Sequence, residues 1–325
     1  MSSQSEFSLI ETYFTDLTSK RDDVTLGIGD DCALLQCPDD HVVAVSIDTL
    51  VEGIHFFNDV DPESLGHKSL AVGLSDLAAM GAEPAWFTLA LTLPEVDNKW
   101  LKAFSQGLAK LAKQYNVQLV GGDTTKGPLT ISIQVHGFVK PEQALRRDGA
   151  QVGDLIYVSG SLGDAGAALQ LKLETWNDEH LSSQDQQSLF QRLEKPTPRV
   201  ELGQKLLEFA SSAIDISDGL SSDLGHILNK SGVGAAIDLT KLPLSPTLQK
   251  IDSKQAQDFA LNSGDDYELC FTIPADKQVA FESTVTEACT QIGVIEAKSG
   301  LRMIGVDGQQ QTLTGSGYDH FSTED

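Results

Sequence analysis

The sequence has few basic residues for its length, and it has no long apolar stretch. Its 325 residues include 23 Lys and Arg against 47 Asp and Glu, which leaves a formal net charge of −24. A chain this negative repels phosphate backbones and anionic lipids, so nucleic acid and membrane surfaces are poor partners. No run of about 18 apolar residues occurs, and the first residues lack the basic start and apolar stretch of a signal peptide. A cytoplasmic protein is expected.

Cysteine is scarce, and the common catalytic motifs are missing. The four cysteines form no C-x-x-C pair, and a chain of this length buries enough core to do without disulfides. The sequence contains no G-x-x-x-x-G-K-[ST], G-x-G-x-x-G, H-E-x-x-H or G-x-S-x-G motif. Its seven histidines are scattered, which weighs against a zinc site. Most standard templates for nucleotide binding and hydrolysis are thereby excluded.

Strand and helix patterns alternate along the whole chain. Helices are predicted over 7–17, 63–80, 98–115 and 199–210, and strands over 41–48, 85–93, 117–120, 129–139, 155–159 and 291–306. The polar stretch 140–154 reads as a linker. Length and alternation predict an α+β domain over residues 1–141 and an α/β domain over residues 142–325.

Asp76 is the most informative single residue, because it lies inside the predicted helix 63–80. Its neighbours one turn away on that helix are Val72, Gly73, Ala79 and Met80. A carboxylate on this apolar face loses water without gaining a partner from its own helix, and such burial is costly. Asp76 therefore needs a cation, a metal or a backbone N–H from another segment. Capping of a neighbouring turn is the plain alternative.

Further aspartates follow predicted strands or glycine-rich turns. Asp48 shares one strand face with Ser46, and Val43, Val45 and Ile47 occupy the other face. Two glycines precede Asp123 and permit close approach of the backbone to a ligand, although a plain surface turn would look the same. The remaining candidates of this kind are Asp31, Asp215 and Asp218.

Together these carboxylates indicate oxygen-only coordination of a hard divalent cation. Mg²⁺ prefers a few carboxylates, several waters and ligand phosphates. Such a composition suits ATP-dependent phosphoryl transfer, in which positioning and charge neutralisation do most of the catalysis. A solvated acidic surface is the alternative interpretation of the same residues.

Eight separated segments resemble thiamine-monophosphate kinases, which belong to the aminoimidazole ribonucleotide synthetase superfamily. These segments are Phe7–Ile10, Gly27–Leu35, Ser46–Leu50, Leu74–Gly81, Gly121–Thr125, Ile214–Leu220, Ser263–Leu269 and Gly317–Phe321. The resemblance covers nearly the whole chain in order. It implies a two-domain fold of the aminoimidazole ribonucleotide synthetase type, with an N-terminal domain that forms a homodimer and holds most metals. The C-terminal domain would close over the substrates.

The resemblance also implies the reaction. ATP and thiamine monophosphate would give ADP and thiamine diphosphate, the last step of thiamine diphosphate biosynthesis. The transfer would be direct and in line, with several Mg²⁺ ions and no phosphoenzyme. No general base is expected, because the acceptor is a phosphate oxygen that is already ionised near neutral pH.

Site residues carry over from the resemblance position by position. The implied Mg²⁺ ligands are Asp31, Ser46, Ile47, Asp48, Asp76, Asp123, Asp215 and Asp218. The implied ATP contacts are Gly122, Asp123, Arg147 and Ser217, and the implied substrate contacts are His55, Asp265 and Tyr318. The family commonly has Thr where Ile47 stands, so only the backbone carbonyl could serve there. It commonly has Glu where Asp265 stands, which shortens the reach of that contact.

Two other functions remain open at this point. A purine-pathway cyclo-ligase would keep the fold and change the substrate, although the Gly317–Phe321 segment argues against it. Selenide-activating relatives need a reactive cysteine in an N-terminal glycine-rich loop, and hydrogenase-maturation relatives end in cysteine, so neither fits this sequence. A non-catalytic module that binds nucleotide or divalent metal is the alternative of a different class.

Overall fold

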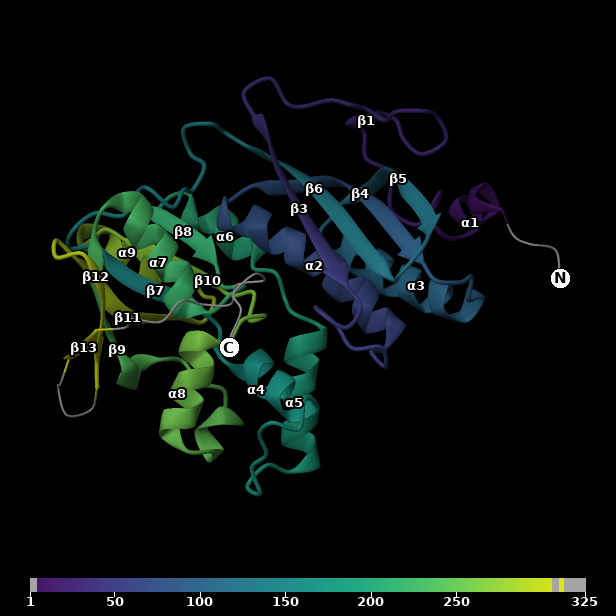
Figure 1. Ribbon diagram of the computed structural model, residues 1–325. Helices are drawn as coiled ribbons and strands as arrows, with labels where there is room; N and C mark the ends of the chain where they lie inside the picture. The colour runs from purple at the N-terminus through teal and green to yellow at the C-terminus, as the bar shows by residue number, and fades with distance from the viewer. Residues whose placement is uncertain (1–4, 306–309, 313–325) are drawn as a thin grey trace. The chain divides into compact units, whose positions relative to one another are not determined.

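The computed structural model describes residues 5–305 and 310–312. The chain divides into two compact units (Figure 1). The N-terminal unit comprises residues 1–77 and 82–143, and the C-terminal unit comprises residues 78–81 and 144–325. Each unit combines a sheet with helices, as expected of the two-domain architecture. The predicted boundary at residues 141 and 142 stays a prediction.

The described part of the N-terminal unit has a sheet of four strands. Their order is β3 (Val42–Val51), β6 (Thr130–Val139), β4 (Glu83–Leu93) and β5 (Gln118–Lys126). β4 and β5 run parallel, and the other pairs are antiparallel. Helices α2 (Pro62–Ala79) and α3 (Asn98–Gln114) lie along one face of this sheet (Figure 1). The smaller elements are α1 (Glu6–Tyr13), β1 (Val24–Leu26) and β2 (Leu34–Leu35).

Helices α2 and α3 cross at two glycines. A Cβ added to Gly66 would lie 2.0 Å from the carbonyl oxygen of Phe104, and one added to Gly107 would lie 1.9 Å from that of Glu63. Only glycine permits such close backbone approach. The crossing fixes α2 over the sheet, and α2 carries Asp76.

Strand β3 has apolar side chains on the outer face of the sheet and polar side chains on the face toward the helices. Its large apolar side chains face outward, with Val43 39%, Val45 53% and Ile47 62% exposed. Its alternate residues Ser46 and Asp48 lie on the side toward α2 and are partly buried. The predicted division of this strand into two faces is therefore confirmed, and the polar face is the inner one.

Two boundary predictions were wrong. β3 continues to Val51, so Asp48 lies inside the strand and not at its end. β5 continues to Lys126, so Gly121, Gly122 and Asp123 belong to a strand and not to a turn. Gly122 has φ +152°, and a Cβ there would lie 1.9 Å from the carbonyl oxygen of Leu89 on β4. Gly122 thus serves close strand packing, and a Gly-Gly pair with this role cannot be told from a turn in the sequence.

The described part of the C-terminal unit has a sheet of seven strands. Their order is β13 (Gln310–Thr312), β12 (Gly300–Ile304), β9 (Gly234–Asp238), β11 (Cys289–Glu296), β7 (Leu155–Ser159), β10 (Leu269–Ile273) and β8 (Ser212–Asp215). Only β9 and β12 pair in parallel among these described strands. The single strand predicted over 291–306 is two strands, β11 and β12, because Gly300 turns the chain with φ +96°.

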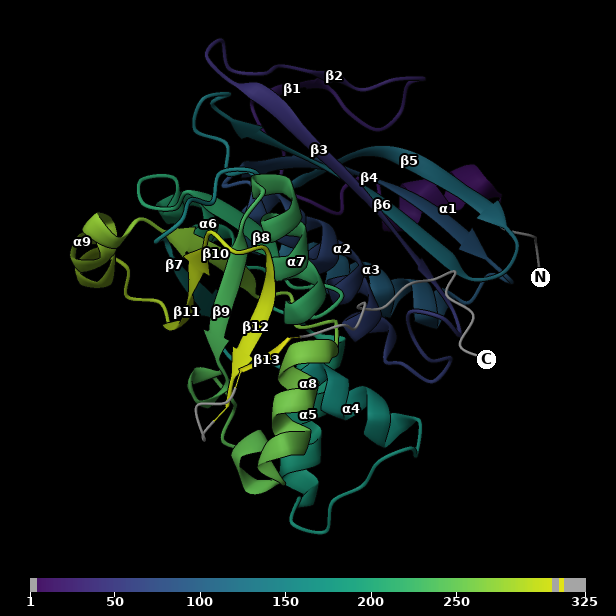
Figure 2. The same cartoon turned by 60° about the vertical axis from the view of Figure 1, so that its left-hand side comes forward.

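Helices accompany this second sheet (Figure 2). They are α4 (Asp164–Lys172), α5 (Ser183–Glu194), α6 (Val200–Leu206), α7 (Leu220–Ser231), α8 (Ser253–Asn262) and α9 (Gln278–Thr284), with short 3₁₀ turns η1 (Leu239–Lys241), η2 (Leu248–Lys250) and η3 (Ala275–Lys277). The polar, glutamine-rich segment 173–194 contains α5, which buries Leu189 and Leu193 among side chains of α4 and α8. Within the described residues, no helix combines the length and hydropathy needed to cross a membrane.

Candidate functional site

A polar cluster lies between β3 and α2 in the N-terminal unit. The Ser46 hydroxyl donates to Asp76 Oδ2 at 2.5 Å. Asp48 Oδ2 is buried and has no hydrogen-bond partner in the described structure. A Cβ on Gly73 would lie 3.5 Å from that same oxygen. Asp76 thus has a side-chain hydroxyl as a partner, where the sequence predicted a cation, a metal or a backbone N–H. A Cβ on Gly73 would collide with Val135, 2.9 Å away, and would make only ordinary contact with Asp48.

The electrostatics of this cluster favour a cation. Burial, followed by the charge of Asp76, raises the pKa of Asp48 to about 7. The Ser46 hydroxyl binds the Asp76 carboxylate, and the Asp48 carboxylate keeps one buried oxygen without a donor. An unpaired buried carboxylate is costly, and a metal ion is a common remedy.

The donor set of this cluster suits Mg²⁺. Two carboxylates and a hydroxyl are hard oxygen ligands, and Mg²⁺ is usually held by one or two carboxylates with waters and phosphates completing its shell. Within residues 5–305 and 310–312, no group of three or more His, Cys, Asp or Glu side chains is placed to hold a metal. The predicted ligands therefore do not form a single closed cage within this part of the chain.

Asp123 lies on the other face of the same sheet. The register aligns Thr49 of β3 with Ser132 of β6, then with Ala90 of β4 and finally with Asp123 of β5. Ala90 and Asp123 are both exposed. The Ile47 side chain also points to this outer face, so its side chain is not part of the inner cluster. The fold thus separates Asp123 from Asp48 and Asp76 within one chain.

The other predicted residues of the N-terminal unit lie in loops. Asp31 is exposed, and its N–H donates to the side chain of Asp30 at 2.8 Å. His55 is half-buried and accepts the Val51 N–H at Nδ1, 3.0 Å away, which closes the loop after β3. The structure does not bring either residue together with Asp123. Tyr318 lies outside the described residues.

In the C-terminal unit, two loops carry most of the predicted residues. Asp215 ends β8 and is 4% exposed, and Ser217 and Asp218 follow in the turn before α7. Three backbone hydrogen bonds join this turn to the loop 263–268: Ile216 N–H to Glu268, Tyr267 N–H to Ile216, and Asp265 N–H to Ser217, at 2.8–2.9 Å. Ser217, Asp218 and Asp265 are therefore brought together.

Asp265 has an uncommon backbone conformation for an aspartate. Its φ is +67°, and the Tyr267 hydroxyl donates to its Oδ1 at 3.0 Å. The preceding Gly264 admits no side chain, because a Cβ would lie 2.1 Å from the carbonyl oxygen of Ser217. Strained backbone of this kind is frequent where a side chain is aimed at a ligand.

The structure distinguishes the two neighbouring arginines. Arg146 is held by Asp148, with Nε and a terminal nitrogen 2.9 and 2.6 Å from the two carboxylate oxygens. Arg147 is exposed, and its guanidinium makes no ion pair in the described part of the chain. Its backbone carbonyl accepts the Ser231 hydroxyl at 2.9 Å. Arg147, the residue predicted to contact ATP, is thus the one available to an anion.

Sequence reasoning missed Asp223. This residue is 2% exposed, and its Oδ2 accepts the N–H groups of both Ser217 and Asp218 at 3.0 Å. Burial raises its pKa to about 7, partly offset by those hydrogen bonds and by the charge of Arg147. Its position in the first turn after Gly219 is the only signal in the sequence, and helix starts commonly carry aspartate for ordinary capping.

Sequence reasoning also missed a buried ion-pair network around Glu268. Glu268 is fully buried and accepts from Ser159 Oγ at 2.5 Å, from Arg192 at 2.9 Å and from two nitrogens of Arg199. The neighbouring Asp266 accepts the Gly163 N–H at 2.8 Å, and burial raises its pKa well above the usual range. These contacts anchor the loop 263–268 that carries Asp265.

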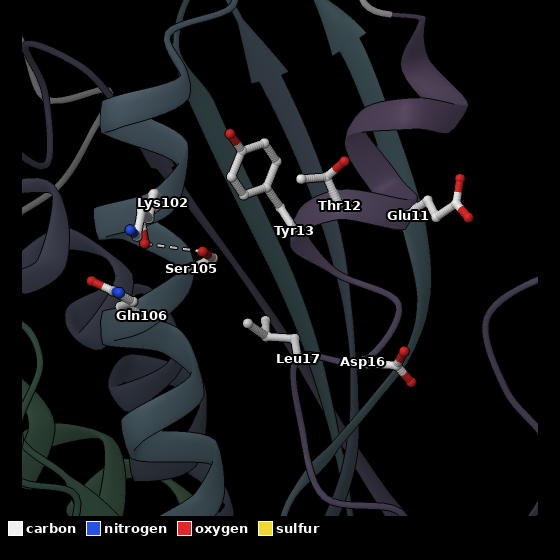
Figure 3. Close-up of a pocket in the computed structure, with 8 residues that line it drawn as sticks. All are labelled: Glu11, Thr12, Tyr13, Asp16, Leu17, Lys102, Ser105 and Gln106. Carbon is white, nitrogen blue, oxygen red and sulfur yellow. Dashed lines mark hydrogen bonds between the residues drawn. The ribbon is translucent and has the colours of Figure 1, made fainter.

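A cavity of about 620 Å³ lies at the surface between α1 and α3 (Figure 3). None of the predicted site residues lines it. Ser105 Oγ donates to the carbonyl oxygen of Lys102 at 3.1 Å, and Thr12 Oγ1 donates to that of Ser8 at 2.6 Å. These two hydroxyls are hydrogen-bonded within their own helices. The cavity therefore lacks the carboxylate clusters found around Asp48 and around Ser217.

Comparison with known protein families gives two matches along the chain. Residues 29–139 match the N-terminal domain of AIR synthase related proteins, and residues 151–306 match the C-terminal domain of the same proteins. Together the two matches span most of the chain. The chain therefore has the two-domain architecture of an AIR synthase related protein, as the sequence predicted.

Individual relatives narrow the class. The chain is 50% identical to thiamine-monophosphate kinase of Salmonella typhimurium over 328 residues, and 50% identical to that of Escherichia coli K12 over 326 residues, with 98% of each chain covered in both cases. A crystal structure of thiamine-monophosphate kinase from Stenotrophomonas maltophilia K279a superposes with a TM-score of 0.83 at 47% identity, covering 90% of this chain and 93% of the other. The chain belongs to the thiamine-monophosphate kinase family, whose members are enzymes.

Gly73→Ala tests the close packing of α2 against Val135 of β6, next to Asp48. The added Cβ would lie 2.9 Å from Val135 Cγ1, so we expect the free energy of unfolding to fall by about 1–3 kcal/mol. The expected loss occurs although alanine is the better helix former. Urea unfolding measures the difference.

Gly225→Ala in α7 is the matched control, because a Cβ there meets no atom within 4 Å. That variant should gain up to about 1 kcal/mol. An equal gain in Gly73→Ala would show that α2 is not tightly packed against Val135.

Proposed function

We propose that the chain transfers the γ-phosphoryl group of ATP to thiamine monophosphate and releases thiamine diphosphate and ADP. The transfer is direct and in line, is assisted by several Mg²⁺ ions, and completes thiamine diphosphate biosynthesis in the cytoplasm. The observation that carries the proposal is 50% identity over 98% of two relatives named thiamine-monophosphate kinase. A further solved structure, described as AaThiL complexed with AMPPCP and TMP, is 32% identical with a TM-score of 0.77 and covers 99% of this chain and 98% of the other.

The inner cluster of the N-terminal unit would hold Mg²⁺ through Asp48, Asp76 and Ser46. The unpartnered Asp48 oxygen and the Asp48 pKa of about 7 support this assignment, because both reflect a buried Asp48 carboxylate beside the charge of Asp76. Bound Mg²⁺ would neutralise phosphate charge and keep the transferring group and its acceptor in line. Asp31, Asp123, Asp215, Asp218 and the Ile47 carbonyl are the further proposed ligands.

The C-terminal unit supplies two of the four proposed ATP contacts, Arg147 and Ser217. The Arg147 guanidinium is exposed and makes no ion pair in the described structure, so it can bind phosphate oxygens. The N–H and carbonyl of Ser217 are both engaged, which leaves its hydroxyl for the nucleotide. Gly122 and Asp123 on β5 are the two proposed ATP contacts of the N-terminal unit. Asp265, His55 and Tyr318 are the proposed contacts to thiamine monophosphate. No general base is required, because the acceptor phosphate is ionised.

Product identification tests the proposal directly. Purified protein incubated with MgATP and thiamine monophosphate should form thiamine diphosphate and ADP in equal amounts, and neither thiamine nor an aminoimidazole precursor should be phosphorylated or cyclised. Asp123→Asn should lower the rate at least about 100-fold because it removes charge beside the transferred phosphate. Because Asp123 is exposed, the unfolding midpoint of the Asp123→Asn variant should equal that of the wild type.

Asp39→Asn, an exposed aspartate of the same unit, is the matched control and should retain full activity. Nucleotide binding without turnover would favour a non-catalytic module, and conversion of the aminoimidazole precursor would favour a cyclo-ligase. Either outcome would refute the kinase assignment.

We also propose that the outer face of the N-terminal sheet is a homodimer interface. Val43, Val45 and Ile47 form a row of exposed apolar side chains on β3, which is an edge strand of the described sheet. Proteins rarely leave such an edge uncovered. A second copy of the same chain is the proposed partner, and its contact would cover the face that carries Asp123.

Val45→Lys should break the proposed dimer. Sedimentation equilibrium is expected to give twice the mass of one chain for the wild type and the mass of a single chain for the variant. Val279→Lys changes an 80% exposed valine on α9 and should leave the mass unchanged. A wild-type protein that sediments as a single chain at micromolar concentration would contradict the dimer.

A further inference from the structure

Asp223 lies beneath the turn that carries Ser217 and Asp218. Asp223 is 2% exposed, and its Oδ2 accepts hydrogen bonds from two consecutive backbone N–H groups at 3.0 Å. An oxygen that accepts both N–H groups fixes the orientation of the peptide plane between them. The side chains of Ser217 and Asp218 therefore leave the backbone in directions that Asp223 sets.

Helix α7 connects this carboxylate to Arg147 as well. Asp223 stands in its first turn, where the Asp223 N–H donates to the Gly219 carbonyl at 3.0 Å. Ser231 in its last turn donates its hydroxyl to the Arg147 carbonyl at 2.9 Å. The charge of Arg147 also acts on the Asp223 carboxylate. One helix thus ties together the two groups proposed to contact ATP, Arg147 and Ser217.

The turn is held from its other side by the loop 263–268. The Asp265 N–H donates to the Ser217 carbonyl at 2.9 Å, and Gly264 lies too close to that carbonyl to carry a side chain. Both backbone groups of Ser217 are therefore engaged, the N–H by Asp223 and the carbonyl by Asp265. Loss of the Asp223 contact would release one of the two attachments.

We propose that Asp223 is a positioning residue of the nucleotide site, and that it acts by holding the Ser217 and Asp218 N–H groups so that the Ser217 hydroxyl and Arg147 meet the same ATP molecule. This inference rests on the proposed function, because it takes ATP as the ligand of this turn. It assigns to Asp223 no contact with ATP, metal or thiamine monophosphate.

Asp223→Ala and Asp223→Asn separate positioning from general stability. Alanine removes the acceptor, so the KM for ATP should rise at least about tenfold while the KM for thiamine monophosphate changes less than about threefold. Asparagine is nearly the same size and keeps one acceptor oxygen, so it should restore the KM for ATP to within about threefold of the wild type. Steady-state kinetics with each substrate varied in turn measure both constants.

Asp154→Ala is the matched control in the same unit. Asp154 is 5% exposed, and its Oδ2 accepts from the Gln151 N–H at 2.9 Å and from the Ser211 hydroxyl at 2.5 Å. Its removal should lower the unfolding midpoint and leave the KM for ATP unchanged. The inference is overturned if Asp154→Ala raises that KM as much as Asp223→Ala does, or if Asp223→Ala leaves it within about twofold of wild type.

A second measurement covers the case in which Asp223→Ala does not fold. Hydrogen exchange of the Ser217 and Asp218 amides, with calorimetric binding of AMPPCP, can then be followed in Asp223→Asn. Wild-type protection of both amides with binding within about threefold of the wild type supports the inference, as does faster exchange with correspondingly weaker binding. Faster exchange of both amides with unchanged AMPPCP binding overturns it. AMPPCP binding is read without turnover, so a wild-type protein that binds AMPPCP but makes no thiamine diphosphate refutes the proposed function separately.

Discussion

The N-terminal unit is built around two carboxylates that approach each other between a strand and a helix. The Ser46 hydroxyl donates to Asp76 on α2, and Asp48 on β3 keeps one buried oxygen without a donor. Burial and mutual repulsion raise the pKa of Asp48 to about 7. An arrangement of this kind costs folding free energy unless a cation offsets it. This cost in folding free energy is the physical reason to propose that the cluster binds a metal. The packing of the unit does not by itself require the two carboxylates.

The surrounding fold is consistent with that role. Glycines at positions 66 and 107 bring α2 and α3 into backbone contact, and Gly73 lets α2 pack closely against Val135 of β6. The inverted polarity of β3 places its polar residues inward and its apolar row outward. In the C-terminal unit, carboxylates serve a different purpose, because Asp223 and Glu268 are satisfied by backbone N–H groups and by arginines. The two carboxylates Asp223 and Glu268 therefore fix loops of the C-terminal unit.

The periodicity of the sequence was enough to predict most of the elements and the two faces of β3. It also predicted that Asp76 needs a partner from outside its helix, since its helical neighbours are apolar. It could not predict that Asp123 lies on the opposite face from Asp48, because that depends on a register shift between β4 and β5 and on a strand that continues through two glycines. Nor could it single out Asp223 or Glu268, because a helix-start aspartate and a strand-start glutamate look ordinary until the loops that they hold are known. Long-range pairing, and not local propensity, determines these positions.

The central claim is that the Asp48 and Asp76 cluster is a divalent-cation site. Crystals grown with Mn²⁺ and AMPPCP would test it through anomalous diffraction, since Mn²⁺ replaces Mg²⁺ at oxygen ligands and its anomalous signal identifies it. The account predicts an anomalous peak about 2.1 Å from Asp48 Oδ2, with Asp76 as a second ligand. It is contradicted if Mn²⁺ binds elsewhere in the crystal while Asp48 Oδ2 remains without a metal or takes a protein donor.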